Sequence, residues 1–217
     1  MTTHARRALG AAAGRWGLVA LLLATLAVGA VAATATGPTV GTWATYRWTS
    51  SVTEEVPVLV RQEGQGGQVS WSIAKETAPP APIFVTYSIV RGDARTYTLQ
   101  IVTQQTADGT PLSVTQTQVE RATGKALRSV IQRPKGVIET PESGFRPLRE
   151  AALKGGAKES VTVPAGTFAA TRGSWADGTV WVSDQIPALG LVKANLKTGM
   201  LELVKSGGSG AKDLLRS

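Results

Sequence analysis

The sequence predicts an all-β protein built on a single strongly curved antiparallel sheet, a half-barrel of about 10–12 strands with one short helix. Three observations support this fold class. Apolar and polar residues alternate with a period of two, as in Val69, Trp71 and Ile73 against Ser70 and Ser72. Turn residues separate the alternating segments at short intervals. The sequence also lacks the long helical patterns that crossovers between parallel strands require, so we expect antiparallel pairing.

The chain is expected to begin with a secretory signal peptide over residues 1–35, which forms an N-terminal signal helix. Basic residues at 6, 7 and 15 precede an uncharged apolar run from Trp16 to Ala33, and A-x-A-like exits close the segment at 30–32 or 33–35. Cleavage there places the working protein in the periplasm or outside the cell. An uncleaved membrane anchor is the alternative, because the apolar run is just long enough to span a bilayer.

The mature chain is predicted to form one domain over residues 36–205. Its alternating segments predict strands near 43–51, 55–62, 67–75, 83–91, 95–104, 112–120, 127–133, 160–164, 166–173, 178–184, 190–195 and 200–205. Asp108-Gly109 and Asp177-Gly178 are typical hairpin dipeptides, and 197–199 is a similar turn. The segment from Leu112 to Glu120 is polar on both faces, which suits a sheet edge or a face open to water.

Two segments depart from the strand pattern. Phe145 to Lys154 places apolar residues, Leu148 among them, at helical spacing, and Gly155-Gly156 ends it. We expect a short helix there, packed against one face of the sheet. Residues 206–217 open with Ser-Gly-Gly-Ser-Gly and are expected to form a flexible tail.

Composition and charge exclude several kinds of chemistry. The chain has no cysteine, and its single histidine, His4, lies in the leader, so we predict no metal site and no cofactor. Without the three basic residues of the leader, the chain keeps 20 of its 23 Lys and Arg and all 15 acidic residues. Its net charge is then +5. That charge permits weak association with an anionic membrane surface but lacks the basic stripe of a nucleic-acid binder.

An envelope hydrolase is the alternative enzymatic hypothesis. Ser72-Ile73-Ala74-Lys75 matches the S-x-x-K motif of penicillin-recognising enzymes, and Lys197-Thr198-Gly199 matches their K-T-G. However, a separation of three in an alternating strand sends Ser72 and Lys75 to opposite faces. The carboxylate pairs Asp177 with Asp184, and Glu139 with Glu142, could act in glycoside hydrolysis, but turns and loops also explain them. We therefore predict no catalytic residue.

The aromatic residues suggest a binding surface. Bulky aromatic side chains concentrate on a few predicted strands, and an apolar concavity between the curved sheet and the short helix could hold an acyl chain or similar ligand. A plain aromatic core is the simpler interpretation. The predicted ligand-binding residues are Trp43, Trp48, Trp71, Tyr97, Leu148, Phe168 and Trp181.

Three segments resemble elements of uncharacterised secreted bacterial proteins. They are Val40-Gly41-Thr42-Trp43-Ala44-Thr45-Tyr46, the stretch Glu159-Ser160-Val161-Thr162-Val163-Pro164-Ala165-Gly166-Thr167-Phe168, and Val180-Trp181-Val182-Ser183-Asp184-Gln185-Ile186-Pro187. Those proteins look like relatives of the lipoprotein-carrier (LolA/LolB-like) half-barrel fold. The resemblance implies a curved antiparallel sheet with a helical lid over an apolar cavity, and by analogy a lipid or another hydrophobic ligand. The expected function is thus that of a non-enzymatic exported envelope protein that acts as a binding or structural module. The sequence assigns no oligomeric state.

Overall fold

A computed structural model describes residues 7–8, 38–63, 69–78, 80–133, 136–140, 156–175 and 178–215. The regular elements in these ranges are all β-strands. Within the same ranges, no helix provides an apolar stretch of the length that a bilayer crossing requires. The predicted helix at 145–154 and nearly all of the predicted signal peptide lie outside the described residues.

The prediction of an all-β chain with an open antiparallel sheet is confirmed. Each of the twelve predicted strands overlaps an observed strand, and the structure adds a two-residue strand near the N-terminus and one further strand at 136–140. The strands are β1 (Arg7–Ala8), β2 (Trp43–Ser50), β3 (Glu54–Glu63), β4 (Val69–Ala78), β5 (Ile83–Gly92), β6 (Thr96–Gln104), β7 (Pro111–Glu120), β8 (Ala126–Arg133), β9 (Gly136–Thr140), β10 (Lys158–Val163), β11 (Gly166–Trp175), β12 (Gly178–Val182), β13 (Leu191–Leu196) and β14 (Gly199–Gly207).

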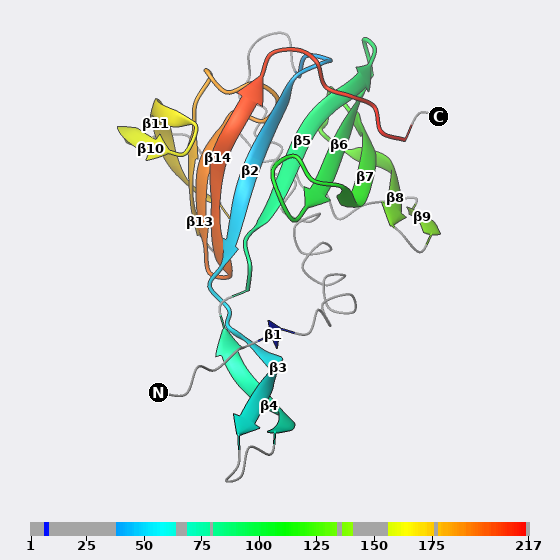
Figure 1. The fold of residues 1–217 in the computed structure, drawn as a ribbon. Coiled ribbons are helices and arrows are strands. Elements are labelled where there is room, and N and C mark those ends of the chain that lie inside the picture. Colours follow the sequence, from blue (N-terminus) through cyan, green and yellow to red (C-terminus); the bar gives the residue numbers. More distant parts are fainter. Residues whose placement is uncertain are drawn as a thin grey trace.

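The main sheet has eleven strands in the order β10-β11-β12-β13-β14-β2-β5-β6-β7-β8-β9. Its two wings, β10 to β14 and β5 to β9, are joined by β2, which pairs with β14 on one side and β5 on the other. The first and last strands of the domain therefore lie side by side at its centre (Figure 1). The chain passes from one wing to the other through residues 141–157, which connect the two edge strands β9 and β10.

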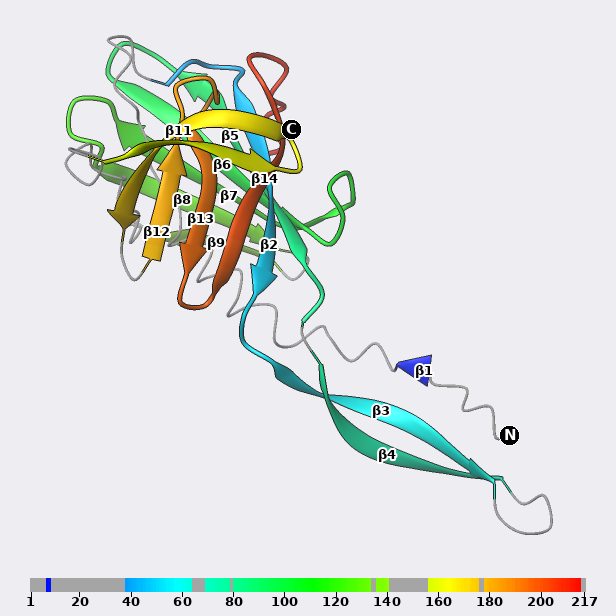
Figure 2. The same cartoon turned by 90° about the vertical axis from the view of Figure 1, so that its left-hand side faces the viewer.

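Two of the predicted strands leave the main sheet. β3 and β4 pair with each other in a long antiparallel hairpin, and β1 pairs with β3 at residues 58 and 59. Because β2 and β5 are neighbours in the main sheet, the hairpin between them projects as an arm from one end of the sheet (Figure 2).

The main sheet curves strongly and stays open. The register of adjacent strands shifts at five places, for example around Val90 between β5 and β6 and around Val204 between β14 and β2. Such bulges bend strands and increase their twist. At one end, the hairpin of β10 and β11 folds back far enough for the Ala165 N–H to donate to the Leu203 carbonyl at 3.1 Å.

The inner face of the curve holds the apolar core. Alternation along β2 turns Ala44, Tyr46 and Trp48 inward, and all three are buried. The rings of Tyr46 and Tyr87 meet edge to face at 5.6 Å, and the Tyr46 hydroxyl donates to the Leu191 carbonyl at 2.9 Å. Burial raises the pKa of both phenols well above the ordinary value, so both stay neutral hydrogen-bonding groups.

β7 is not an edge strand, although its polar sequence suggested an edge or a water-facing position. It has β6 on one side and β8 on the other, and Thr115, Gln116 and Thr117 are buried. Polar neighbours make this possible: the Thr117 and Ser129 hydroxyls lie 2.8 Å apart, and Gln116 bonds to Gln100 on β6. A buried polar group with a hydrogen-bond partner avoids most of its desolvation penalty.

The C-terminal residues lie against the main sheet. The first two residues of the predicted tail, 206 and 207, complete β14. Residues 208–215, called here the tail segment, then run from the end of β14 across β5 and β6 (Figure 1). The backbone N–H of Ala211 donates to the Gly41 carbonyl at 2.9 Å, and more distant contacts follow below.

Candidate functional site

Two of the predicted ligand-binding residues lie on the inner face. Trp48 on β2 and Tyr97 on β6 are both almost fully buried in the core cluster. Burial raises the pKa of Tyr97 to about 12, although the Arg121 guanidinium 5.5 Å from the ring centre acts in the opposite direction. Both residues therefore contribute to the packing of the inner face in the structure.

Two other predicted residues lie on the outer face. Trp43 precedes Trp48 by five positions in the same strand, so the two side chains point to opposite faces. The Trp43 indole donates to the Ser209 carbonyl at 2.9 Å. Trp181 alternates with the buried Val180 and Val182, and its indole donates to the Glu159 carboxylate.

The remaining predicted residues do not complete a common site. Phe168 on β11 is partly buried against the core cluster. The side chain of Trp71 and the whole of Leu148 lie outside the described residues. Among the seven predicted residues, the structure thus brings Trp48 and Tyr97 to the inner face, packs the partly buried Phe168 and Trp181 against the core cluster, and places Trp43 on the outer face.

The residues considered for an alternative hydrolase site also lie on separate elements. Ser72 stands opposite Val60 and Lys75 opposite Pro57 in the β3–β4 register, so Ser72 and Lys75 lie on opposite faces of the hairpin arm. Lys197 belongs to the turn between β13 and β14 in the main sheet. Asp184 is exposed in the loop after β12. Asp177, Glu142 and the side chain of Glu139 are outside the described part of the chain.

The inner face changes in character from one wing to the other. Around β2, β5 and β14 it carries large apolar side chains such as Val85, Leu201 and Leu203. On β6 the same face still carries buried apolar side chains, such as Leu99 and Ile101, and buried hydroxyls gather around β7: Thr103 pairs with Ser113, Thr117 pairs with Ser129, and Thr115 lies between Ile101 and Ile131. The inner face is therefore apolar around its centre and gains hydroxyls among apolar residues around β7.

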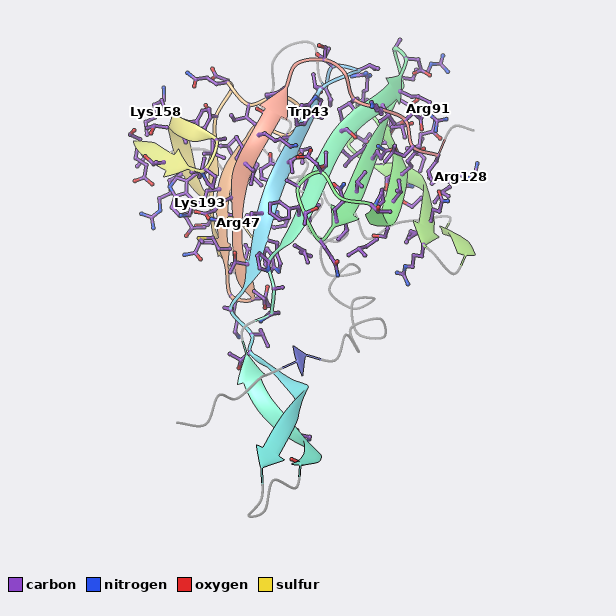
Figure 3. The ribbon with its side chains drawn as sticks, viewed as in Figure 1. Trp43, Arg47, Arg91, Arg128, Lys158 and Lys193 are labelled. Carbon is purple, nitrogen blue, oxygen red and sulfur yellow. The ribbon has the colours of Figure 1, made fainter. Side chains whose placement is uncertain are left out.

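The outer face carries a charged row over β13, β14 and β2. Glu202 pairs in register with Lys193 on one side and Arg47 on the other. Arg47 donates to its carboxylate at 2.8 Å and Lys193 at 3.3 Å, and Figure 3 labels the two cations over neighbouring parts of the sheet. Burial alone would raise the pKa of Glu202, but these hydrogen bonds and positive charges hold it below its ordinary value of 4.5.

A second polar cluster on the outer face was not predicted from the sequence. Gln100 on β6 and Gln116 on β7 stand opposite each other, and both side chains are buried. Arg91, near the end of β5, donates to the Gln116 side-chain oxygen at 2.6 Å (Figure 3). The polar alternation of β7 was the available signal, but it does not show that the tail segment covers these residues.

In the described part of the chain, no three His, Cys, Asp or Glu side chains gather as a metal site requires. Comparison of the chain with protein-family models, with curated proteins and with solved structures finds no match. The relationship to the lipoprotein-carrier fold therefore rests on the sequence resemblance and stays a prediction.

Proposed function

We propose that this chain is a non-enzymatic exported envelope protein that binds an amphiphilic ligand, such as a lipid, against the inner face of its curved sheet. The observation that carries the proposal is the change of polarity across that face. An acyl chain suits the apolar side around Trp48 and Val85, and a polar head group suits the hydroxyls of Thr103, Thr115 and Ser129.

The likeness to half-barrel lipid carriers supports the same proposal from the sequence. In this proposal a helix at 145–154 covers part of the inner face, since that segment connects the two edges of the sheet. The leader over 1–35 directs the chain out of the cytoplasm. N-terminal sequencing of protein recovered from the cell envelope tests this point: a start after residue 32 or 35 is expected, and an intact Met1 would contradict cleavage.

Trp48 and Trp43 provide a matched pair for testing the ligand site, because they lie on opposite faces of β2. Bromine quenches indole fluorescence only at short range, so a dibrominated stearate bound on the inner face should quench Trp48. We expect saturable quenching of the delipidated protein by this probe. The Trp48→Phe variant should lose a large part of the quenching, whereas Trp43→Phe should keep it.

Calorimetric titration with unbrominated stearate separates loss of the reporter from loss of binding. Both variants should bind it about as tightly as the parent, because Phe preserves most of the apolar volume. Absence of saturable quenching in the parent, or quenching that disappears in Trp43→Phe and persists in Trp48→Phe, would exclude the inner face as the ligand site.

A further inference from the structure

The tail segment crosses the outer face of β5, β6 and β7 without regular secondary structure. It begins near β2, where the Trp43 indole holds the Ser209 carbonyl and Gly41 accepts a hydrogen bond from Ala211. It then reaches the cluster of Arg91, Gln100 and Gln116, which is called here the tail site. These contacts link residues about 100 positions apart in the sequence.

Gln100 recognises the backbone of the tail segment. Its side-chain amide donates to the Lys212 carbonyl at 2.9 Å and accepts from the Leu214 N–H at 2.9 Å. One buried amide thus pairs with the carbonyl of residue i and the N–H of residue i+2, the two groups that a neighbouring parallel strand would use. The Lys212 side chain is exposed, so this contact does not depend on which residue stands there.

Gln116 and Arg91 recognise the one acidic side chain of the segment. Gln116 donates to one oxygen of Asp213 at 2.7 Å, and the Arg91 Nε lies 2.7 Å from the other. The carboxylate is largely buried. Gln116 also donates to the Gln100 amide oxygen at 2.9 Å, so the two glutamines are fixed by each other. This part of the site selects a carboxylate, since hydrogen bonds to charged groups are the stronger ones.

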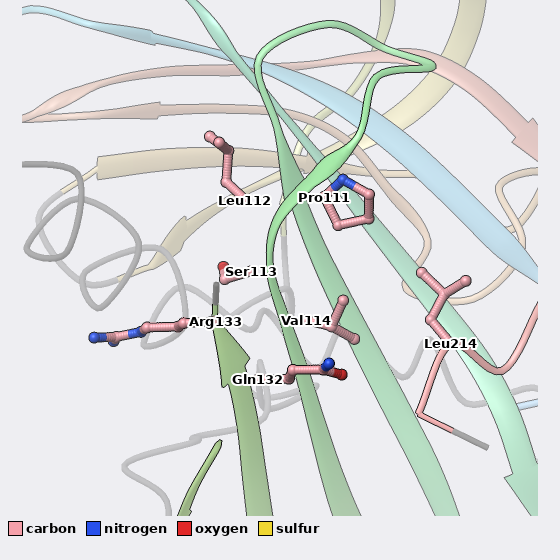
Figure 4. A pocket seen from close by; sticks show the side chains of 7 residues that line it. All are labelled: Pro111, Leu112, Ser113, Val114, Gln132, Arg133 and Leu214. Carbon is pink, nitrogen blue, oxygen red and sulfur yellow. The ribbon is translucent and has the colours of Figure 1, made fainter. Parts of the chain in front are cut away.

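A pocket lies beside Leu214, which is one of the residues that line it. The pocket has a volume of about 290 Å³ and lies where β7 and β8 diverge. Figure 4 shows Leu214 approaching Pro111 and Val114 from the tail segment. Leu214 nevertheless remains 45% exposed. The subsite that follows the carboxylate subsite is lined by apolar residues together with Ser113, Gln132 and Arg133, and it has room for a bulkier side chain than Leu214.

We propose that the tail site is a peptide-recognition surface for an extended segment of a partner protein, in which an acidic residue is followed by a large apolar one. The chain's own tail segment occupies this surface and must be displaced by the partner. The backbone pairing by Gln100, the carboxylate contacts of Gln116 and Arg91, and the partly filled pocket define its specificity. This proposal is independent of the ligand proposed for the inner face.

The experiment uses a fluorescent peptide with the sequence of residues 208–215 and the mature protein truncated after Gly207. Fluorescence anisotropy should show saturable binding. The peptide with Asp213→Asn should bind about 10- to 100-fold more weakly, since a charge-assisted hydrogen bond contributes about 1.5–3 kcal/mol. The peptide with Leu214→Phe should bind about 3- to 10-fold more tightly, because it buries more apolar area in the pocket.

Lys212→Ala in the peptide is the matched control, because Lys212 contributes its carbonyl and its side chain is exposed. Its affinity should stay within about twofold of the parent peptide. Tighter binding of the Leu214→Phe peptide is the result that distinguishes two roles of the tail site. It is expected if the site recognises a partner peptide, and it is not expected if the site only holds the chain's own tail segment.

A second form of the protein keeps the test decisive if the truncated chain does not fold. A specific protease site is inserted after Gly208, where an added Cβ meets no atom within 4 Å, and the folded protein is cut. The labelled Leu214→Phe peptide should then replace the cut tail while circular dichroism shows an intact sheet. No saturable binding to folded truncated protein, or a cut tail that excess peptide cannot replace, would overturn the proposal.

Discussion

Replacing Gly199 with alanine should destabilise the protein by about 3 kcal/mol or more, a large fraction of the total for a single domain. Gly199 opens β14 and stands opposite Ser50 on β2, at the central seam of the main sheet. An added Cβ would collide with the Thr49 carbonyl oxygen and would lie 2.7 Å from the Trp48 ring and 3.0 Å from the Ser50 Cα. Two of these atoms belong to the backbone, so relief requires the seam to open.

Variants at two other glycines separate the steric collision from the conformational strain as causes of the lost stability. Gly136 shares a positive φ, 139° against 155° at Gly199, but an added Cβ there meets nothing within 4 Å. Gly136→Ala should therefore cost only the conformational strain, about 1–2 kcal/mol. Gly208→Ala introduces neither backbone strain nor a close contact. Its free energy of unfolding should stay within about 0.5 kcal/mol of the parent value. Urea unfolding of the three variants measures this order, and a Gly199→Ala loss equal to that of Gly136→Ala would contradict the collision.

Replacing Glu202 with glutamine should destabilise the protein by about 1–2 kcal/mol at neutral pH. The substitution keeps the shape of the side chain but removes the charge that Arg47 and Lys193 share. The two cations on either side then lose their common partner. Glu202 is buried enough for solvent to screen this interaction only in part, unlike an exposed surface pair.

The pH dependence of this loss has a definite sign. Because the pKa of Glu202 is lower in the folded protein, its stabilisation is fully present above the ordinary value of 4.5 and disappears as the pH falls through the folded value. The stability difference between the parent and Glu202→Gln should thus be constant at neutral pH and shrink in acid. Denaturant unfolding at several pH values measures it. Asp184→Asn, in an exposed loop, is the control and should change stability by less than about 0.5 kcal/mol.

The strands were predictable because their signal is local. Alternation of side chains over five to ten residues, ended by turn residues, located β2 to β8 and β10 to β14. The five-residue strand β9 was missed, because Gly136-Val137-Ile138-Glu139-Thr140 gives only two apolar residues between polar ones.

The faces were harder to assign than the strands. Alternation shows that Trp43 and Trp48 point to opposite sides, but it does not show which side the rest of the chain covers. The same ambiguity applies to Trp181, which alternates with two valines that turn out to be the buried residues. Aromatic residues collected from several strands were therefore placed together although the sheet separates them.

The tail site could not be predicted from local pattern at all. Ser-Gly-Gly-Ser-Gly is typical of a chain end without fixed structure, and nothing nearby in the sequence indicates its contacts. The bonds that hold it come from Gln100, Gln116 and Arg91, on strands formed much earlier in the chain. A polar strand such as β7 can lie inside a sheet when a distant segment supplies its partners.

The seam between β2 and β14 also has a consequence for the order of folding. Arg47 and Glu202, which bond across it, are 155 positions apart in the chain. Until β14 has been synthesised, β2 lacks one of its two neighbours and each wing keeps an unpaired strand at the centre of the future sheet. Pairing between such distant segments is slow, because loop closure precedes any gain from the contact. The nascent chain therefore cannot complete its main sheet before its last strand exists.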